Sequence, residues 1–569
     1  MQKLFKKDFF WIVLIILVSL MAIFPLFRPG FYPFHDEPQI ANLYQMVRAI
    51  SSGQIPPRWA PDMSFNYGYP LFNFYYPLPF YLGSFFFFLL NKSLVWSLKL
   101  VFLLSVPLSG ICFYLFARKF FRKETSFAGA IIYIFTPYRA VDLYVRGAVG
   151  EMWSFVFMPL VLFFFINLIE KRSLKNIFFS GLSLAGLILA HNLTSIIFFP
   201  FFLTFCLAII FQNKEKIYRL VSIIFGLLLG LSLSAYYWLP AIIERKYIQP
   251  GTPYNPLDHF PFIKQLLSPK WGYGASVWGP NDQMSFQIGI ANLLVVILIT
   301  ILFFLDRKKI QKEKKFLLIL ILFFFVICVF LMNVRSWFFW QILPLGNYVQ
   351  FPWRFLLLTT FFSSFLVGFF GDLSEKSFSK YLPFLLAVLA IIVTLKYFRP
   401  EKFIKVDDDY YLSRFFANRT SKGKREFFSD NYLKYSEDYL PLTIWTKKRP
   451  DSLPDQKIEI KKGSLNFKEI SPTFFEAEIE AEEPTEVIFH NYFFPGWEAT
   501  VDNHKEEIKI KEPYGEISIP LSSGKHLLVI RFLETPIRLF ADLITFVSLV
   551  ILIFLSFGKL NPKFSLKLK

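Results

Sequence analysis

Long apolar runs alternate with short basic connections over most of this chain, and this pattern predicts a bundle of membrane-spanning helices. The first run, Phe9 to Phe27, follows Lys3, Lys6 and Lys7. It is long enough to cross a bilayer, and no small-residue cleavage site follows it, so we expect a retained first helix rather than a signal peptide. Eleven further spans are expected near residues 94–117, 126–138, 152–169, 176–190, 194–211, 220–240, 287–305, 316–333, 352–371, 381–397 and 536–557.

The composition agrees with this interpretation. Of 569 residues, 54% are hydrophobic and only 18% are charged, whereas a soluble protein is about one quarter charged. An ordinary cytosolic enzyme, a disordered protein and a coiled coil are excluded. The net charge of +19 would suggest nucleic acid in a soluble chain. In a membrane protein it marks cytoplasmic loops, so membrane lipids are the expected partners and nucleic acid is not.

The three cysteines, Cys112, Cys206 and Cys328, each lie inside an apolar run and far from one another. They provide neither a disulfide framework nor the spacing of metal ligands, so we expect them to be buried packing residues. The sequence contains no glycine-rich phosphate loop and no His/Cys metal cluster.

The stretch 74–90 is apolar but is interrupted by Pro77, Pro79 and Gly83. If it spanned the membrane, every later loop would change sides. Without it, the inner segments hold about 25 Lys and Arg in roughly 61 residues, against about 11 in some 140 residues of the short outer loops. We therefore expect 74–90 to lie along the outer interface or to re-enter. The chain then has twelve spans, with both termini in the cytoplasm.

This orientation divides the chain into a multi-span membrane domain (1–397), an outer β-rich domain (398–535) and a last helix with a basic tail (536–569). The first outer loop, 28–93, is expected to carry interfacial helices. Alternating apolar and polar positions predict strands in the outer domain, and turn signals separate them, so a small β-sandwich is expected. The strands are expected at 474–481, 506–511 and 526–532.

Polar residues that are unusual in such a chain gather near the outer ends of the predicted spans. Charged groups are costly at the bilayer centre, so their placement is informative about function. A path for ions would need polar groups at several depths, whereas one rim of acids and bases favours chemistry at the outer face. The rim comprises His35, Asp36, Glu37, Arg139, Asp142, Arg146, Glu151, His191, Asn192, Glu244, Arg245, Arg335 and Arg354.

The triplet His35-Asp36-Glu37 opens the first outer loop. Two neighbouring carboxylates at an apolar boundary can take different roles, one as a desolvated base and the other paired with a cation or metal. The alternative is a solvated loop or an N-cap for a helix from Gln39 to Ser51. The triplet alone does not decide between these interpretations.

Arg139, Asp142 and Arg146 are spaced by three and four residues, so on a helix they share one face and Asp142 can bridge the arginines. Such a cluster can bind a phosphate, because guanidinium groups match phosphate oxygens bidentately; an interfacial ion-pair network is equally compatible. Arg354 lies at the mouth of a span, where snorkelling explains it nearly as well as ligand binding. His191 fits a structural turn between two spans.

Taken in order, the motifs resemble a known family. The sequences His35-Asp36-Glu37, 53–59 (GQIPPRW) and 67–81 (YGYPLFNFYYPLPFY) are similar to bacterial membrane proteins described as 6-pyruvoyl-tetrahydropterin synthase-related, although nothing indicates pterin chemistry. The sequence 494–503 (FPGWEATVDN) resembles the C-terminal domain of YfhO-like proteins. The resemblance continues through 146–151, His191-Asn192, 237–244 and 350–354.

Both groups resemble the GT-C superfamily of glycosyltransferases. The resemblance implies an inverting enzyme that takes a sugar from a polyprenyl-phosphate donor, with a catalytic acid in the first outer loop. Asp36 matches this acid and Glu37 is its neighbour, although a histidine precedes Asp36 where two acids are the commoner pattern. The acceptor, whether glycan, lipid or protein, is not implied.

The chemistry suggests roles for the remaining rim residues. The leaving phosphate would be held by Arg146, Arg354 and Arg139, and aromatic groups would stack on sugar or polyprenyl units. A divalent metal, Mg²⁺ or Mn²⁺, is compatible with Asp36 and Glu37. Supporting roles fall to His35, Asp142, Glu151, His191 and Glu244, and stacking roles to Trp59, Tyr67, Tyr69 and Tyr75.

Two other functions use the same scaffold. A non-catalytic factor for lipid or polysaccharide transport or envelope assembly would need a continuous polar path to the cytoplasm. A sugar-binding envelope protein would place recognition in the β-sandwich. The fold alone does not choose between them and a transferase.

Overall fold

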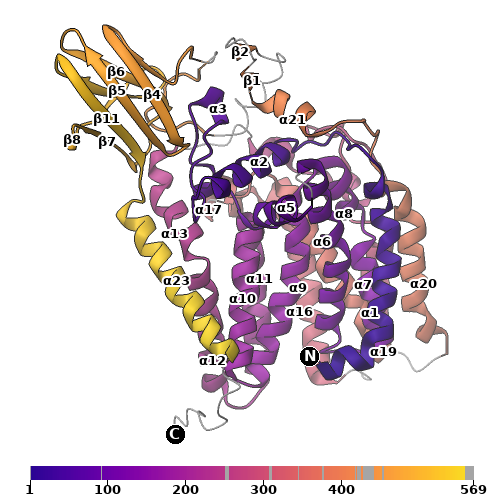
Figure 1. Ribbon diagram of the computed structural model, residues 1–569. Helices are drawn as coiled ribbons and strands as arrows, with labels where there is room; N and C mark the ends of the chain where they lie inside the picture. The colour runs from indigo at the N-terminus through magenta and orange to yellow at the C-terminus, as the bar shows by residue number, and fades with distance from the viewer. Residues whose placement is uncertain are drawn as a thin grey trace.

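The computed structural model describes residues 2–557 apart from 91–92, 250–254, 307–310, 344, 374–376, 417, 420–424, 427–440 and 451–453. The long helices stand side by side in one bundle, and the β-sheets project from one end of it (Figure 1). Helices of the bundle are α1 (Gln2–Ile23), α6 (Leu94–Ala117), α7 (Lys123–Ile134), α9 (Val149–Glu170), α10 (Leu174–Ala190), α11 (Asn192–Phe211), α12 (Lys216–Leu233), α13 (Ala235–Ile243), α15 (Ile290–Asp306), α16 (Lys312–Leu331), α18 (Leu356–Leu366), α20 (Ser377–Thr394) and α23 (Pro536–Phe557).

Shorter helices occupy the connections. They are α2 (Pro38–Ser51), α3 (Met63–Asn66), α4 (Leu71–Phe74), α5 (Leu78–Leu89), α8 (Pro137–Val141), α14 (Ile263–Leu267), α17 (Trp337–Ile342), α19 (Phe370–Leu373) and α21 (Asp408–Phe415). Helices α2 and α5 lie at the end of the bundle that carries the β-sheets (Figure 1). At 12 residues α5 is too short to span a bilayer by itself.

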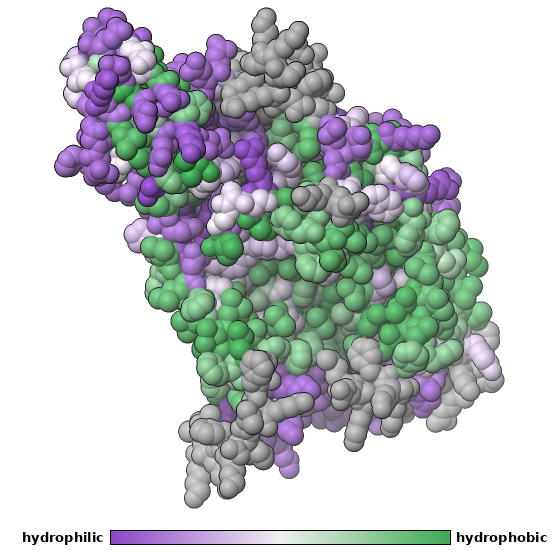
Figure 2. Space-filling view, in the orientation of Figure 1, coloured by the Kyte–Doolittle hydropathy of each residue, from purple (hydrophilic) through white to green (hydrophobic). Residues whose placement is uncertain are grey.

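Eight of the described helical segments are long and apolar enough to cross a membrane. The other four predicted spans coincide with the shorter helices α7, α10, α15 and α20, so the count of twelve stays a prediction. On the face shown in Figure 2, hydrophobic residues form a band across the bundle, with hydrophilic residues above and below it. The eight segments are Asp8–Phe27, Leu94–Ala117, Val149–Glu170, Asn192–Phe211, Lys216–Leu233, Lys312–Leu331, Pro352–Asp372 and Pro536–Phe554.

Burial places α9 at the centre of the bundle. Of its hydrophobic window 83% is buried, against 22% for α23, which lies at the periphery. The three cysteines are buried and free. Helix ends are fixed by side chains: Ser93 caps α6, Ser173 caps α10 and His191 caps α11, each accepting a backbone N–H of the first turn.

The predicted span 220–240 is two helices, because the chain breaks at Ser234 between α12 and α13. Thr545 of α23 satisfies backbone groups at this break. Its hydroxyl donates to the carbonyl of Ser232 and accepts the N–H of Tyr236, at 3.2 and 2.9 Å. A distant helix therefore supplies the hydrogen bonds that an unbroken helix would have made internally.

Two antiparallel sheets follow the helices in the C-terminal part of the chain. Their strand orders are β3-β6-β10-β9 and β4-β5-β11-β7-β8. The sheets pack face to face through Phe475, Phe489 and Trp497, with the Phe475 and Phe489 rings 4.9 Å apart. The strands are β3 (Ile458–Ile460), β4 (Gly463–Ser471), β5 (Phe474–Ala481), β6 (Thr485–Tyr492), β7 (Trp497–Val501), β8 (His504–Glu506), β9 (Lys509–Lys511), β10 (Glu516–Leu521) and β11 (Gly524–Phe532).

The predicted strand 474–481 coincides with β5, and 526–532 lies within β11. The single strand predicted at 506–511 is wrong, because the chain there is divided between the end of β8 and β9, which belong to different sheets. The region before these strands contains α21 and a short pairing of β1 (Asn418–Arg419) with β2 (Arg425–Glu426). The domain boundaries at 397 and 535 stay predictions.

The predicted orientation can be tested by cysteine labelling in intact cells. Ser523→Cys, in the exposed turn before β11, is expected to react with a membrane-impermeant maleimide. Lys312→Cys is at the exposed start of α16, where Lys314 pairs with Asp372 of α19 at the end of the bundle away from the β-sheets (Figure 1), and it is expected to react only after the cells are opened. If Lys312→Cys alone were labelled in intact cells, the predicted orientation would be wrong and the opposite one would hold.

Candidate functional site

One large cavity opens at the end of the bundle near the β-sheets. Its volume is about 1670 Å³, larger than the 300–1,000 Å³ that is usual for a site for a single small molecule. Polar and charged side chains line one part of it, and apolar side chains from α10 to α13 line another. The charged residues and histidines in the lining are His35, Asp36, Arg146, Glu151, His191, Arg245, His259, Arg354 and Arg449.

Glu151, in the first turn of α9, is the centre of a buried ion-pair cluster. Its carboxylate accepts hydrogen bonds from the Tyr138 hydroxyl at 2.6 Å and from Arg146 Nη2 at 2.9 Å. Arg354 Nε lies 3.7 Å from the same carboxylate. Asp142 forms the second ion pair of Arg146, whose guanidinium also packs 4.6 Å from the Trp353 ring centroid. Every charge in this cluster therefore has an opposite charge beside it.

Asp36 lies beside this cluster because two stretches of backbone pair with each other. The N–H of His35 donates to the carbonyl of Val145 at 3.0 Å, and the N–H of Asp36 donates to that of Arg146 at 2.8 Å. The second stretch belongs to the π-helix η2 (Asp142–Arg146), which Gly147 ends in a left-handed conformation, with φ +68°. A Cβ on Gly147 would lie 2.1 Å from the Phe34 ring, so this position requires glycine.

The pKa values of Asp36 and His191 are shifted in opposite directions. Burial raises the pKa of Asp36 above its ordinary value, while the charges of Arg146 and Arg354 oppose this rise. Burial lowers the pKa of His191 to about 3, so its ring is neutral at physiological pH. Its Nδ1 accepts the N–H of Thr194 at 3.2 Å, which leaves the proton on Nε2.

Arg354 has unused hydrogen-bond donors. Its Nη2 donates weakly to Gln350 Oε1 at 3.4 Å. Its Nε and Nη1 are buried and have no hydrogen-bond partner among the described residues, although the side chain lines the cavity and is only 8% exposed. A buried guanidinium with unsatisfied donors is a suitable site for an anion.

Glu37 does not face the cavity. Its carboxylate pairs with Arg414 of α21 at 3.1 Å. Burial raises the pKa of Glu37, and the charge of Arg414 opposes the rise. At the start of α21, Asp408 accepts the N–H groups of Leu94 and Val95 at the first turn of α6. The two neighbouring carboxylates of the first loop thus point to different partners.

Arg139 and Asp142 also lie apart from the cavity. The Arg139 guanidinium donates to Ser109 Oγ at 2.5 Å and packs 4.3 Å from the Phe155 ring centroid, in the core between α6 and α9. The helix changes from α8 to the π-helix η2 at Asp142. Asp142 pairs with Arg146 and also interacts electrostatically with Arg139, so it lies between the two arginines.

The predicted stacking residues divide into two pairs. Tyr69 and Tyr75 line the cavity, and Tyr75 is stacked on Tyr76 with ring centroids 4.3 Å apart. Tyr67 instead donates to Glu516 of β10 at 3.0 Å, and Trp59 packs 5.3 Å from Trp497 of β7. Tyr67 and Trp59 therefore attach the first loop to the β-sheets.

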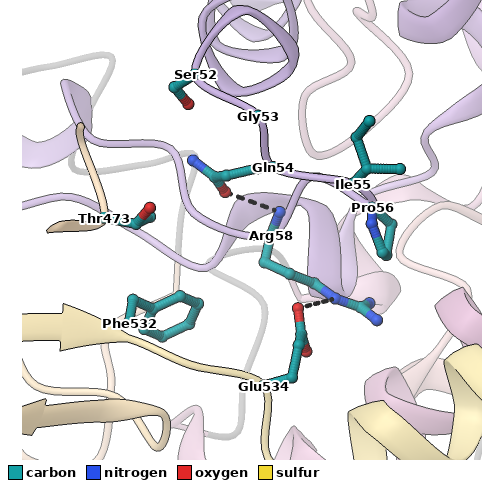
Figure 3. A pocket seen from close by; sticks show the side chains of 9 residues that line it. All are labelled: Ser52, Gly53, Gln54, Ile55, Pro56, Arg58, Thr473, Phe532 and Glu534. Atoms are coloured by element: carbon teal, nitrogen blue, oxygen red, sulfur yellow. Dashed lines mark hydrogen bonds and ion pairs between the residues drawn. The ribbon is translucent and has the colours of Figure 1, made fainter. Parts of the chain in front are cut away.

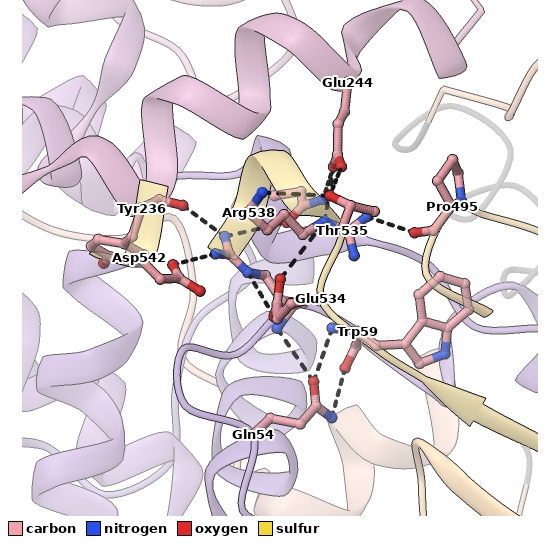
Figure 4. A network of polar contacts seen from close by, with 11 residues as sticks. Gln54, Trp59, Tyr236, Glu244, Pro495, Glu534, Thr535, Arg538 and Asp542 are labelled. Carbon is pink, nitrogen blue, oxygen red and sulfur yellow. Dashed lines mark hydrogen bonds and ion pairs between the residues drawn. The ribbon is translucent and has the colours of Figure 1, made fainter. Parts of the chain in front are cut away.

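Glu244 belongs to a buried network at the junction of the bundle, the first loop and α23. It accepts from Asn73 Nδ2, from the Thr535 hydroxyl and from Arg538 Nε at 2.7, 2.8 and 3.0 Å (Figure 4). Arg58 continues the network to Asp542 at 2.7 Å. Its guanidinium also pairs with Glu534 at the wall of a small pocket of about 190 Å³ (Figure 3). The structure places Glu244 behind the cavity wall and not in the lining.

The described residues contain no group of three or more His, Cys, Asp and Glu side chains placed to hold a metal ion. Asp36 and Glu37 diverge, because Glu37 is turned to Arg414. The two carboxylates therefore do not fit the Mg²⁺ or Mn²⁺ site suggested by their adjacency.

Several residues of the site were not singled out from the sequence. Tyr138 and Trp353 flank Arg139 and Arg354 in the chain, so proximity to these arginines was an available signal. Arg449 follows α21 in the chain, and no sequence motif around it marks it as a residue of the site. His35, which was predicted, lines the cavity and its Nε2 lies 2.9 Å from the carbonyl of Tyr273.

Comparison with known proteins identifies relatives of this chain. The membrane-protein family described by the 6-pyruvoyl-tetrahydropterin synthase related domain matches residues 72–400. A protein of Lactococcus lactis subsp. cremoris (strain MG1363), described as uncharacterized, is 26% identical over 253 residues, which cover 42% of this chain and 41% of that protein.

Solved structures with a similar fold include two glycosyltransferases. The arabinofuranosyltransferase AftD from Mycobacteria has a TM-score of 0.46 at 12% identity, covering 70% of this chain and 27% of that one. The Archaeoglobus fulgidus oligosaccharyltransferase has a TM-score of 0.43 at 13% identity, covering 79% and 62%. The chain thus spans less than two thirds of each of these relatives.

Loss of the Glu37–Arg414 ion pair is expected to destabilise the protein. Glu37→Gln leaves a largely buried guanidinium without its charged partner, which costs about 1–3 kcal/mol. The melting temperature of the purified protein should fall by several degrees. Glu483→Gln, which breaks an exposed pair with Lys462, is the control and should change stability by less than about 1 kcal/mol. Equal melting temperatures for both variants would contradict this role of Glu37.

Proposed function

We propose a function for this chain, which belongs to the membrane-protein family described by the 6-pyruvoyl-tetrahydropterin synthase related domain: it is a membrane glycosyltransferase. It takes a sugar from a polyprenyl-phosphate donor and transfers it, with inversion, to an acceptor hydroxyl. The reaction takes place at the outer face of a bacterial plasma membrane. The resemblance of the sequence motifs to the GT-C superfamily supports the reaction class.

The main support is that Asp36 and Arg354 line the same cavity. A carboxylate can accept a proton, and the unused Nε and Nη1 donors of Arg354 can hold a phosphate. Transfer from a lipid phosphate needs these two functions within reach of one sugar.

The apolar part of the cavity fits the lipid of such a donor. It is lined by residues such as Leu187, Phe199 and Leu231. Phe199 and Leu231 are each 41% exposed although they belong to the long apolar helices α11 and α12. A polyprenyl chain can therefore enter from the side while its phosphate reaches the polar end.

The proposed reaction follows from this arrangement. Asp36 removes the proton of the acceptor hydroxyl, whose oxygen bonds to the anomeric carbon from the face opposite the phosphate. The bond between that carbon and the phosphate oxygen breaks, and its electron pair stays on the departing lipid phosphate. Arg354 stabilises the charge that develops there. The proton leaves Asp36 to water after the product departs.

Glu151 and Arg146 hold the reacting groups in position. The Glu151 carboxylate fixes Arg146 and lies 3.7 Å from Arg354. The carbonyl of Arg146 accepts the Asp36 N–H. The neutral His191 adds no positive charge that would compete with the arginines for the phosphate.

Asp36→Asn is expected to reduce sugar transfer by about 10²-fold or more, because the acceptor loses its base. Purified protein would be incubated with a panel of polyprenyl-phosphate sugars, and release of lipid phosphate would be measured. Asp409→Asn, at an exposed position of α21, should keep full activity. Full activity of Asp36→Asn would exclude it as the base. Absence of transfer by the wild type with every donor would favour the transport or assembly function.

The pH profile tests the electrostatic coupling of Asp36 to Arg354. A base works only when deprotonated, so kcat/KM is expected to fall as the pH drops through the raised pKa of Asp36. Arg354→Gln removes a positive charge that lowers this pKa, so the acid limb should move to higher pH as binding of the donor weakens. Exposed Arg335→Gln is the control and should leave the limb in place. A limb unmoved in Arg354→Gln would contradict the coupling.

A further inference from the structure

Two consecutive residues of the cavity lining have buried hydrogen-bond donors without a partner. Among the described residues that line the cavity, every buried side-chain nitrogen or oxygen that lacks a hydrogen bond belongs to Trp353 or Arg354. The atoms are Nε1 of the Trp353 indole and Nε and Nη1 of the Arg354 guanidinium. All three can only donate, so each needs an acceptor. The proposed reaction uses the guanidinium but not the indole N–H.

Both side chains project from one well-packed point of the chain. Trp353 and Arg354 belong to the 3-10 helix η7 (Pro352–Phe355), which leads into α18. Pro352 restricts the backbone at the start of this helix. The N–H of Arg354 donates to the carbonyl of Phe351 at 3.1 Å. Of the apolar window in the segment that begins here, 89% is buried, so the backbone below the two side chains is held in place.

Neighbouring groups fix the orientation of the Trp353 indole, which is only 2% exposed. The ring is stacked on Phe351 with centroids 4.9 Å apart and an interplanar angle of 13°, and on Phe286 at 5.9 Å and 27°. The Arg146 guanidinium lies 4.6 Å from its centroid. Stacked contacts occupy the faces of an aromatic ring, whereas the N–H lies in the ring plane at the edge. These contacts therefore orient the N–H without satisfying it.

The indole also lies beside the groups that the proposed reaction uses. Arg146, which contacts the Trp353 ring, donates to Glu151 at 2.9 Å, and Arg354 Nε lies 3.7 Å from the same carboxylate. The carbonyl of Arg146 accepts the N–H of Asp36 at 2.8 Å. A substrate whose phosphate is held by Arg354 would bring several oxygens to this end of the cavity. An indole N–H can bind one of them without adding a charge to the cluster.

Other indoles show that a missing partner alone does not mark a binding site. The buried N–H groups of Trp59, Trp271 and Trp497 also lack a hydrogen bond. None of these three is among the described residues that line the cavity. Trp353 differs from them because it lines the cavity and directly precedes Arg354, whose donors are also unused.

We infer that Trp353 binds the donor substrate directly, through a hydrogen bond from its indole N–H to an oxygen of the donor head group. This inference rests on the proposed function, since it assigns a binding residue for the substrate of that reaction. The oxygen belongs either to the phosphate or to the sugar attached to it. Both are hydrogen-bond acceptors, and the experiment below separates them.

Calorimetric titration of the purified full-length protein tests this contact. Two probes would be used: a short-chain prenyl monophosphate, and the same prenyl phosphate carrying the sugar that the wild type binds most tightly. Trp353→Phe removes the N–H but keeps an aromatic ring. Trp353→His fills less volume than Phe but restores a ring N–H. Trp271→Phe is the matched control, because it removes an unpartnered indole N–H outside the lining, from a ring stacked 4.4 Å from Tyr397.

Trp353→Phe is expected to weaken binding by about tenfold. If the phosphate accepts the N–H, both probes lose affinity. If the sugar accepts it, only the sugar-linked probe loses affinity and the monophosphate binds as it does to the wild type. Trp353→His should bind more tightly than Trp353→Phe, whereas a role in packing alone predicts the opposite order, since His is the smaller side chain. Trp271→Phe should bind both probes as the wild type does.

Two results would overturn the inference. One is binding of both probes by Trp353→Phe at the level of Trp271→Phe, and the other is binding by Trp353→His that is no tighter than binding by Trp353→Phe. In either case the wild type still binds the probes and transfers sugar. Failure of the proposed function has a different signature, because the wild type then binds neither probe and transfers no sugar, and the assignment of Trp353 is lost with it.

Discussion

A buried carboxylate in a hydrophobic bundle must be neutralised where it lies, and Glu151 imposes this constraint on the end of the bundle that carries the β-sheets. Its partners come from two parts of the chain: Tyr138 and Arg146 belong to the segment just before α9, and Arg354 lies about 200 residues further on. Removing a charge from water costs several kcal/mol unless opposite charges and hydrogen bonds replace the water. The need to satisfy Glu151 therefore draws these segments together, and Asp36 follows because its backbone pairs with Arg146.

A second buried network determines how the β-sheets meet the bundle. Glu244, Arg538 and Asn73 join α13, α23 and the first loop, and Arg58 extends the contacts to Asp542. These groups are hydrogen-bonded to one another, so loss of any partner would leave a buried charge. The network lies directly behind the Leu71–Phe74 wall of the cavity. The position of the β-sheets and the shape of the cavity are in this way physically connected.

The cavity combines two environments that one amphiphilic substrate would need. Its apolar walls belong to helices that reach the hydrophobic band, and its polar end carries carboxylates and guanidinium groups. Low polarity around the charged end strengthens each electrostatic contact made there. Glu37 pairs with Arg414 and does not line the cavity, so the two adjacent carboxylates of the first loop have different surroundings.

Hydrophobic runs by themselves determined that this is a helical membrane protein, and alternation determined the strands β5 and β11, because these patterns depend only on neighbours in the chain. Asp36, Arg146, Glu151, His191 and Arg354 could also be found from the sequence, because polar residues near the ends of such apolar runs are rare. Only the tertiary structure decided which of the rim residues share a cavity. Arg139 contacts Ser109 and Phe155 in the core, Glu37 pairs with Arg414 of α21, and Glu244 pairs with Arg538 of α23. Arg449 entered the cavity from a linker about 400 residues beyond Asp36. Pairing of buried charges depends on which distant segments meet, and a linear sequence does not contain that information locally.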